Sequence, residues 1–340
     1  IVVITPQTFT YTTDLNSNVS VTGCATTCPT NLVIPATLGG NPVTEIADTA
    51  FYNVGTIARV SLPDTLTRIG FAAFAVNQIK SFTIPDSVTN VDAFAFANNP
   101  LRSILFMGDA PNVAGGIFNN VSTLAEVLIL PTGANYGSEI GGLPTRVLEV
   151  SAISDGAGHG VLSGCGSSCP ENLVIPPKIG GDTIVGIGDL ALLGRSLTSV
   201  VIPDSVTSIG TASFFVNNID YLQLGSGLTT IGQSAFFGNS LTEVEFGPNL
   251  VTISSSAFGN NSIASLSVPE GVTSIGDFAF MNDPIATISL PSTLVSIGTS
   301  AFENSHIVSL YLPDSLTALG PSAFASNSLT SLRLSESLTT

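Results

Sequence analysis

The sequence contains very few positive charges. Lys and Arg together number 8 against 24 Asp and Glu, which gives a net charge of −16. Because an acidic surface repels nucleic acid and anionic membranes, we expect neither as a partner. Long apolar runs are also missing. None approaches the roughly 20 residues that a membrane-spanning helix needs, and the longest, such as 127–130, have the length of a strand. We therefore expect no direct membrane insertion.

Catalytic motifs are missing as well. The two histidines, His159 and His306, accompany no Ser or Cys nucleophile motif. No Gly-rich loop precedes a helix in the way that a phosphate-binding cradle requires. The sequence therefore favours a protein that is not an enzyme and that uses no cofactor.

What the sequence does contain is a repeat of 22 residues. The stretch 269–290, PEGVTSIGDFAFMNDPIATISL, is followed by a near copy at 291–312. Alignment of the repeats puts Phe in one column and Gly in a second, with Ser254 replacing one Gly. The Phe column holds Phe214, Phe236, Phe258, Phe280, Phe302 and Phe324, and the Gly column holds Gly210, Gly232, Gly276, Gly298 and Gly320. A short fixed period indicates a solenoid whose units bury their apolar faces against one another.

Each repeat predicts one strand, a turn and a return path. Period-two alternation places Val200 and Ile202 in the core, so Ser199 and Val201 face outward. Stacked copies would form a parallel sheet, and the Pro that follows each strand would end it. The Gly of the return path, such as Gly276, is expected where the chain turns sharply. Each buried Phe should contribute roughly 1.5–3 kcal/mol.

A polar slot lies three residues after the Phe in most repeats. It holds Asn77, Asn99, Asn217, Asn239, Asn261 and Asn327, with Asp283 as a variant. A side-chain amide has donors and an acceptor, so stacked copies can satisfy the backbone of a buried turn. We interpret this slot as structural rather than ligand-binding.

Two arrays of repeats are predicted, residues 1–150 and 151–340. The first begins with an expected β-hairpin over 9–23 and has its own Phe column, Phe51, Phe74, Phe96 and Phe118. In the second, Leu192 takes the first Phe slot. The boundary is placed near 151–160, SAISDGAGHG, which has the composition of a linker.

The ends of the arrays are irregular. Residues 132–144, which include four Gly, are expected to form a loop that closes the first array. The chain starts at Ile1 rather than Met, and its last residues enter another repeat and stop. We expect a truncated second array and a sequence that is a piece of a longer protein.

The repeat pattern L-x-x-I-x-L-P-x-x-L-x-x-I-G-x-x-A-F-x-x-N resembles the BspA-like leucine-rich repeat family. The matching positions include Pro203, Gly210, Phe214 and Asn217, and the likeness covers roughly residues 32–130 and 173–340. That family often carries Cys where this chain has Asn. The resemblance implies a leucine-rich-repeat solenoid with a parallel sheet on its concave side. It also implies secreted or surface proteins of bacteria, often adhesins, and no catalytic motif.

Each array also opens with a Cys-x-x-x-Cys segment, Cys24 to Cys28 and Cys165 to Cys169. A zinc site needs four ligands close in space, and neither histidine has metal-ligand spacing to these pairs. A thioredoxin-type redox pair needs two intervening residues. We therefore predict a local disulfide in each N-terminal cap, in a protein of an oxidising compartment, and no metal site.

An Asp follows the strand-ending Pro in several repeats, at Asp64, Asp86, Asp204 and Asp314. Pro-Asp is a favoured turn pair, which explains the column by turn chemistry. The alternative is a ladder of carboxylates that shares calcium. Ser226, Glu270 and Ser292 interrupt the column, which favours the turn.

The outward strand positions form the predicted concave face. In the first array they include Arg59/Ser61, Ser81/Thr83, Ser103/Leu105 and Val127/Ile129; in the second, most are Ser or Thr. Large side chains interrupt the second array at Tyr221, Gln223, Glu243, Glu245, Tyr311 and Arg333. Aromatic and Arg residues are favoured anchors in interfaces, so these six are the candidate ligand-binding residues. The same interruptions, and the curvature of a repeat array, argue against a flat ice-binding ladder.

We therefore expect a non-enzymatic recognition or adhesion module that is extracellular or on a bacterial cell surface. Its partner would be a protein or a glycan on a host or neighbouring cell. The alternative is a structural spacer that presents other domains of a larger surface protein.

Overall fold

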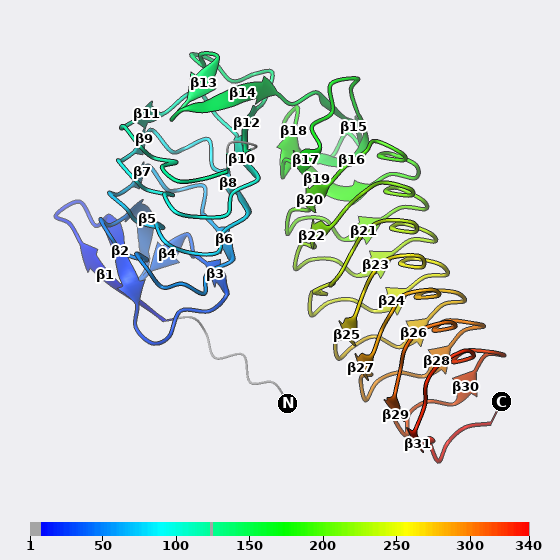
Figure 1. Cartoon of the computed structure of the whole chain (residues 1–340). Helices are drawn as coiled ribbons and strands as arrows, with labels where there is room; N and C mark the ends of the chain where they lie inside the picture. The colour runs from blue at the N-terminus through cyan, green and yellow to red at the C-terminus, as the bar shows by residue number, and fades with distance from the viewer. Residues whose placement is uncertain (1–7, 123–124, 340) are drawn as a thin grey trace. The chain divides into compact units, whose positions relative to one another are not determined.

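The computed structural model describes residues 8–122 and 125–339. The chain forms two compact units, unit 1 (residues 1–148) and unit 2 (149–340). Both are stacks of coils built from short strands and turns (Figure 1). The described residues hold no helix that is long and apolar enough to cross a membrane.

Unit 1 begins with the expected hairpin. Strands β1 (Phe9–Thr13) and β2 (Val19–Cys24) pair antiparallel. In the turn between them, the Asp14 carboxylate accepts hydrogen bonds from the backbone N–H groups of Asn16 and Asn18, both at 2.8 Å. These bonds hold the pKa of Asp14 below its usual value.

The coils of unit 1 contribute strands to three sheets. The first runs β1-β2-β5-β7-β9-β11, the second β13-β14-β12-β10-β8, and β3 pairs with β6. Their bounds are β3 Asn31–Val33, β4 Thr37–Leu38, β5 Asn41–Ile46, β6 Arg59–Ser61, β7 Arg68–Ile69, β8 Ser81–Ile84, β9 Asn90–Val91, β10 Ser103–Phe106, β11 Asn112–Val113, β12 Glu126–Ile129, β13 Glu139–Ile140 and β14 Leu143–Val147.

Two expectations for unit 1 are wrong. Val127 and Ile129 belong to the buried core, because β12 pairs with β10 in a register that sets Glu126 beside Ser103. The coil is one residue longer than the regular repeat, and this reverses the alternation. Residues 132–144 are not a plain loop, since β13 and β14 form a hairpin there and β14 adds to β12 in parallel.

Unit 2 begins with a second hairpin, so the predicted linker is wrong. Strands β15 (Val150–Ser154) and β16 (His159–Cys165) pair antiparallel. The Asp155 carboxylate accepts hydrogen bonds from the N–H groups of Ala157 and His159 at 2.7 and 3.1 Å, as Asp14 does in unit 1. The Gly-rich composition therefore belongs to a tight turn rather than to a linker.

Two rows of parallel strands run through unit 2 (Figure 1). The first row pairs in three pieces, β17-β20-β22, β25-β27 and β29-β31. The return paths form one longer sheet, β15-β16-β19-β21-β23-β24-β26-β28-β30, which the sequence pattern does not predict. The bounds are β17 Asn172–Val174, β18 Lys178–Ile179, β19 Asp182–Ile187, β20 Ser199–Val201, β21 Ser208–Ile209, β22 Tyr221–Gln223, β23 Thr230–Ile231, β24 Thr252–Ile253, β25 Ser265–Ser267, β26 Ser274–Ile275, β27 Thr287–Ser289, β28 Ser296–Ile297, β29 Ser309–Tyr311, β30 Ala318–Leu319 and β31 Ser331–Arg333.

The Phe column forms the core of each unit, as predicted. In unit 2 the rings from Phe214 to Phe324 stack nearly parallel, with neighbouring centroids 4.9–5.5 Å apart. Leu192 is fully buried in the first slot of this column. Burial of one large ring per coil makes each coil depend on its two neighbours.

The Gly column serves a different purpose from the one predicted. Gly276 and Gly298 do not have a positive φ, so no sharp left-handed turn requires them. A Cβ on Gly298 would lie 2.5 Å from the backbone N of Asp277 in the preceding coil. Glycine is therefore needed because adjacent coils approach closely. At Ser254 the hydrogen bond from its N–H to Ile231 O lengthens to 3.3 Å, against 2.8 Å at Gly276.

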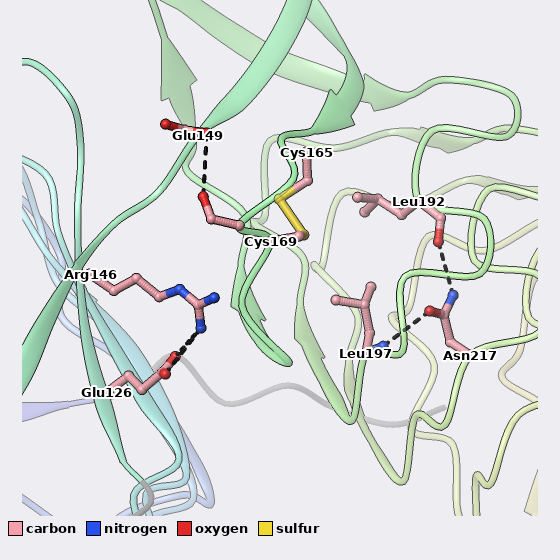
Figure 2. The surroundings of a disulfide bond; sticks show 9 residues. Glu126, Arg146, Glu149, Cys165, Cys169, Leu192, Leu197 and Asn217 are labelled. Atoms are coloured by element: carbon pink, nitrogen blue, oxygen red, sulfur yellow. Dashed lines mark hydrogen bonds and ion pairs between the residues drawn. A yellow bond between two sulfur atoms is a disulfide. The ribbon is translucent and has the colours of Figure 1, made fainter.

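The Asn slots form the structural ladder that the sequence predicts. Figure 2 shows one of them: the Asn217 amide nitrogen donates to Leu192 O, and Leu197 N–H donates to Asn217 Oδ1. The Asn217 amide nitrogen also donates to Phe214 O at 3.0 Å. These three bonds, to two carbonyls in the Phe or Leu column and from one N–H, recur at Asn77, Asn99, Asn239, Asn261 and Asn327.

Each cap contains the predicted disulfide. Cys24 bonds to Cys28 in unit 1, and Cys165 bonds to Cys169 in unit 2. Beside the second bridge, the Ser168 hydroxyl donates to the Glu149 carboxylate at 3.3 Å (Figure 2). Both bridges directly follow the second strand of a hairpin, so they fix the start of each array.

Candidate binding surface

The strand face of unit 2 consists of the outward side chains on β22, β25, β27, β29 and β31, together with residues 243–245 of the coil between β22 and β25. Parallel pairing places equivalent residues beside each other, such as Ser265 beside Thr287 and Tyr311 beside Arg333. Strands in a sheet lie about 4.8 Å apart, so this face presents two rows of side chains along the stack.

The first large group on the strand face is on β22. Tyr221 and Gln223 point to the same side of that strand, and the Tyr221 hydroxyl donates to Gln223 Oε1 at 3.2 Å. Both side chains are half-buried. This contact holds the phenol against the Gln223 side chain.

The next coil carries Glu243 and Glu245, which are exposed on either side of the buried Val244. Residues 243–245 do not form a strand, so the sheet that contains β22 ends there and β25 begins a separate sheet. Two carboxylates at this break give this part of the strand face a negative charge.

The second large group joins β29 and β31. Arg333 lies over the Tyr311 ring, with its guanidinium carbon 4.6 Å from the ring centroid. Its Nη1 donates to the Tyr311 hydroxyl at 2.7 Å, and its Nη2 lies 3.6 Å from Asp314 Oδ2. Tyr311 remains 52% exposed, so the stacked pair presents an aromatic and cationic surface to solvent.

Comparison with known families now identifies the repeats. A profile described as "BspA type Leucine rich repeat region" matches in six copies, over residues 31–139, 185–294 and 251–340. The chain belongs to the BspA-type leucine-rich repeat family. No curated protein sequence matches it.

Several solved structures are similar to this BspA-type chain. A T. pallidum leucine-rich repeat protein has 23% identity and a TM-score of 0.42, covering 51% of this chain and 78% of that one. A leucine-rich repeat protein from Eubacterium ventriosum has 15% identity and a TM-score of 0.41, covering 96% and 94%. A leucine rich cell surface protein from Faecalibacterium prausnitzii has 19% identity and a TM-score of 0.30, covering 97% and 94%.

The six candidate residues of these BspA-type repeats fall into two groups rather than one. Tyr221, Gln223, Glu243 and Glu245 lie on adjacent coils, whereas Tyr311 and Arg333 lie four repeats beyond Gln223 and Glu245 respectively, about 20 Å along the stack. Between the groups, the strand face carries only small hydroxyl side chains. There the Thr287 hydroxyl donates to Ser265 at 2.9 Å.

Some outward positions of the BspA-type strands are not accessible. Ser103, Leu105 and Ser199 are at most 1% exposed, and Val201 is 7% exposed, so the expectation that they face solvent is wrong. The Ser199 hydroxyl is satisfied by Asn172 Oδ1 at 2.8 Å. A Ser hydroxyl is small enough to be buried once it has such a partner.

The Asp that follows Pro in these repeats can accept a hydrogen bond from the next coil, as Asp204 does. Asp204 Oδ1 accepts a hydrogen bond from Ser226 N–H at 2.7 Å, which is turn chemistry between coils. In the next repeat that has an acidic residue at this position, the Glu270 carboxylate accepts a hydrogen bond from Ser292 N–H. Across residues 8–122 and 125–339, no three His, Cys, Asp or Glu side chains cluster as metal ligands would.

The sequence pattern does not predict two features of the BspA-type coils. Asp314 forms an ion pair with Arg333, although the sequence pattern assigns it to the Asp positions that follow Pro. Its position three residues after Tyr311 could have indicated this contact. Leu190, Phe94 and Phe278 are exposed apolar residues with φ of 58–60°, on the turns that follow the return paths. Their apolar type, at a slot otherwise filled by Ala, Ser, Thr or Gly, is the sequence signal for these exposed side chains.

Proposed function

We propose that this chain is a non-enzymatic recognition module that binds a protein or glycan through the strand face of unit 2. The Tyr311–Arg333 pair carries the proposal. It is an aromatic and guanidinium surface that follows a stretch of the strand face holding only Ser and Thr, and such residues are the usual anchors of interfaces. Glu243 and Glu245 would add acceptors for ligand hydroxyl or amine groups.

The place of action that fits this proposal is outside the cell or on the cell surface. Both cysteine pairs are oxidised, and small disulfide-closed caps are typical of proteins from oxidising compartments. The few charged residues and the Ser- and Thr-rich exterior agree with a secreted surface. A host or neighbouring cell would then supply the partner.

The test is a triple variant, Tyr221→Ala, Glu243→Ala and Tyr311→Ala. Its matched control carries Ser208→Ala and Thr230→Ala, which are exposed on the return-path sheet of the same unit. Both proteins are assayed on arrays of glycans and surface proteins and as coats on beads presented to cells. Recognition predicts that the triple variant loses array signal and attachment while the control keeps both.

A structural spacer is the second candidate. The observation that favours it is the return-path sheet of unit 2, which links successive coils from β19 to β30 and would stiffen the stack. A spacer predicts that the triple variant and the control behave alike in every binding assay. Attachment would then not depend on the strand face.

A further inference from the structure

Where two successive slots of unit 2 hold Asn, the Phe carbonyl between them accepts two side-chain hydrogen bonds. Phe236 O, for example, accepts from the amide nitrogen of Asn239 in its own coil at 3.1 Å and from that of Asn261 in the next coil at 3.0 Å. Phe214 O is served in the same way by Asn217 and Asn239. A buried carbonyl in these coils therefore relies on side-chain donors from two successive slots.

Two successive slots lack that amide. The first holds Asp283 and the second holds Ser305, and their side chains are 0% and 1% exposed. Asp283 Oδ2 and Ser305 Oγ have no hydrogen-bond partner within the described parts of the chain. Ile285 N–H, which an Asn at 305 would accept from, donates instead to the Asp283 backbone carbonyl at 2.8 Å. Phe280 O lies between these slots and is left without either amide.

The carboxyl of Asp283 keeps half of the Asn pattern. Its Oδ1 accepts from Ile263 N–H at 3.1 Å. The Oδ1 of each Asn in the ladder likewise accepts from a backbone N–H of the preceding coil. Its Oδ2 therefore occupies the place of the amide nitrogen, whose partners in this register are the carbonyls of Phe258 and Phe280. An ionised oxygen facing carbonyl oxygens in a buried slot is strongly disfavoured.

We propose that Asp283 is a buried proton-binding site, in which the neutral carboxylic acid donates a hydrogen bond to Phe280 O and loss of that proton opens the surrounding coils. Phe280 O is the acceptor because Phe258 O already accepts from Asn261. A protonated Asp has the shape of Asn and one donor, so it continues the ladder. The ionised form has none and breaks it.

The electrostatic setting agrees with this geometry. Burial raises the pKa of Asp283 from 3.8 to about 8, although hydrogen bonds from Ile263 and Asn261 backbone groups oppose the shift. The titratable groups on the neighbouring turns are Asp277, Glu303 and His306, which are all at least partly exposed. None of the three contributes to the raised pKa. The stabilisation is therefore complete below pH 3.8 and is lost as the pH rises through about 8.

The proton can be tested directly in the whole chain. Infrared difference spectra of the protein against Asp283→Asn should show a protonated carboxyl C=O band at pH 6 that disappears above pH 8. Hydrogen exchange of the 258–307 amides, corrected for intrinsic rates, should show an opening equilibrium that rises about tenfold per pH unit between pH 5 and 7. In the Asn variant the opening should not depend on pH.

Asp277→Asn is the matched control, since Asp277 is an exposed carboxylate in the same coil. It should keep both the infrared band and the pH-dependent opening. An ionised Asp283 at pH 6 would overturn the proposal. So would an opening that follows sodium, potassium or calcium concentration rather than pH, because the slot would then hold a cation. If a variant misfolds, the difference spectrum of the unsubstituted protein between pH 6 and a pH above 8 still reports the loss of the protonated carboxyl band.

Discussion

Arg333 stacks on Tyr311 from the equivalent position one repeat later, with 4.6 Å between the guanidinium carbon and the ring centroid. The period of the chain therefore converts a separation of 22 residues into direct contact. Because both side chains are largely exposed, the contact does little for folding and is available for recognition.

Arg333→Ala should weaken binding of the partner selected on the arrays about tenfold or more, because it removes a stacked interface anchor. Thermal stability should change by less than about 0.5 kcal/mol, since the side chain is exposed. Titration calorimetry and thermal melts measure the two effects. Arg333→Lys keeps the charge but not the planar stack and should fall between. Unchanged affinity in the Ala variant would exclude this residue from the interface.

Asn99→Ala should destabilise unit 1 by about 3 kcal/mol or more. The change leaves Ile79 N–H and Phe96 O without their buried side-chain partner and removes one of the two amide donors to Phe74 O. Each buried group left without a partner costs roughly 1–3 kcal/mol. Urea unfolding gives the measurement. Asn112→Ala is the control, because that amide is exposed and donates to the side chain of Asn90. Equal effects of the two changes would contradict the structural role of the slot.

Gly298→Ala should destabilise unit 2 by about 1–3 kcal/mol, because the new Cβ forces two coils apart. Ser254→Ala should be tolerated, since that coil already accommodates a Cβ with a longer backbone hydrogen bond. Thermal melts compare the two variants. If Gly298→Ala were neutral, close approach would not explain the Gly column.

Reduction of the disulfides should cost about 2 kcal/mol each or less. Each bridge spans a sequence separation of only 4, and the chain-entropy contribution of so short a loop is small. Melting with and without reductant measures the loss, and Cys165→Ser with Cys169→Ser isolates the second cap. Complete unfolding on reduction would show that the bridges do more than fix the hairpin ends.

The fold could be predicted in detail where one residue type has the same structural role in every repeat. The Phe column, the Asn ladder and the Cys pairs follow from the sequence because each slot repeats the same chemistry. The second hairpin could also have been predicted. Asp14 lies as many residues before Asp155 as Cys24 lies before Cys165, so the sequence places an equivalent turn in front of each cysteine pair. The candidate site was harder to predict, since outward orientation of a strand position does not determine its exposure.

The sequence by itself determined the period, the core columns and the polar ladder, because these depend on what each residue can bury or donate. Only the tertiary structure decided why Gly298 must lack a Cβ, that the return paths pair into a sheet, and that Asp283 Oδ2 and Ser305 Oγ are buried without a hydrogen-bond partner among the described residues. These features depend on the distance between coils whose residues are far apart in the chain. A pattern along one strand carries no information about the atoms that the neighbouring coil places against it.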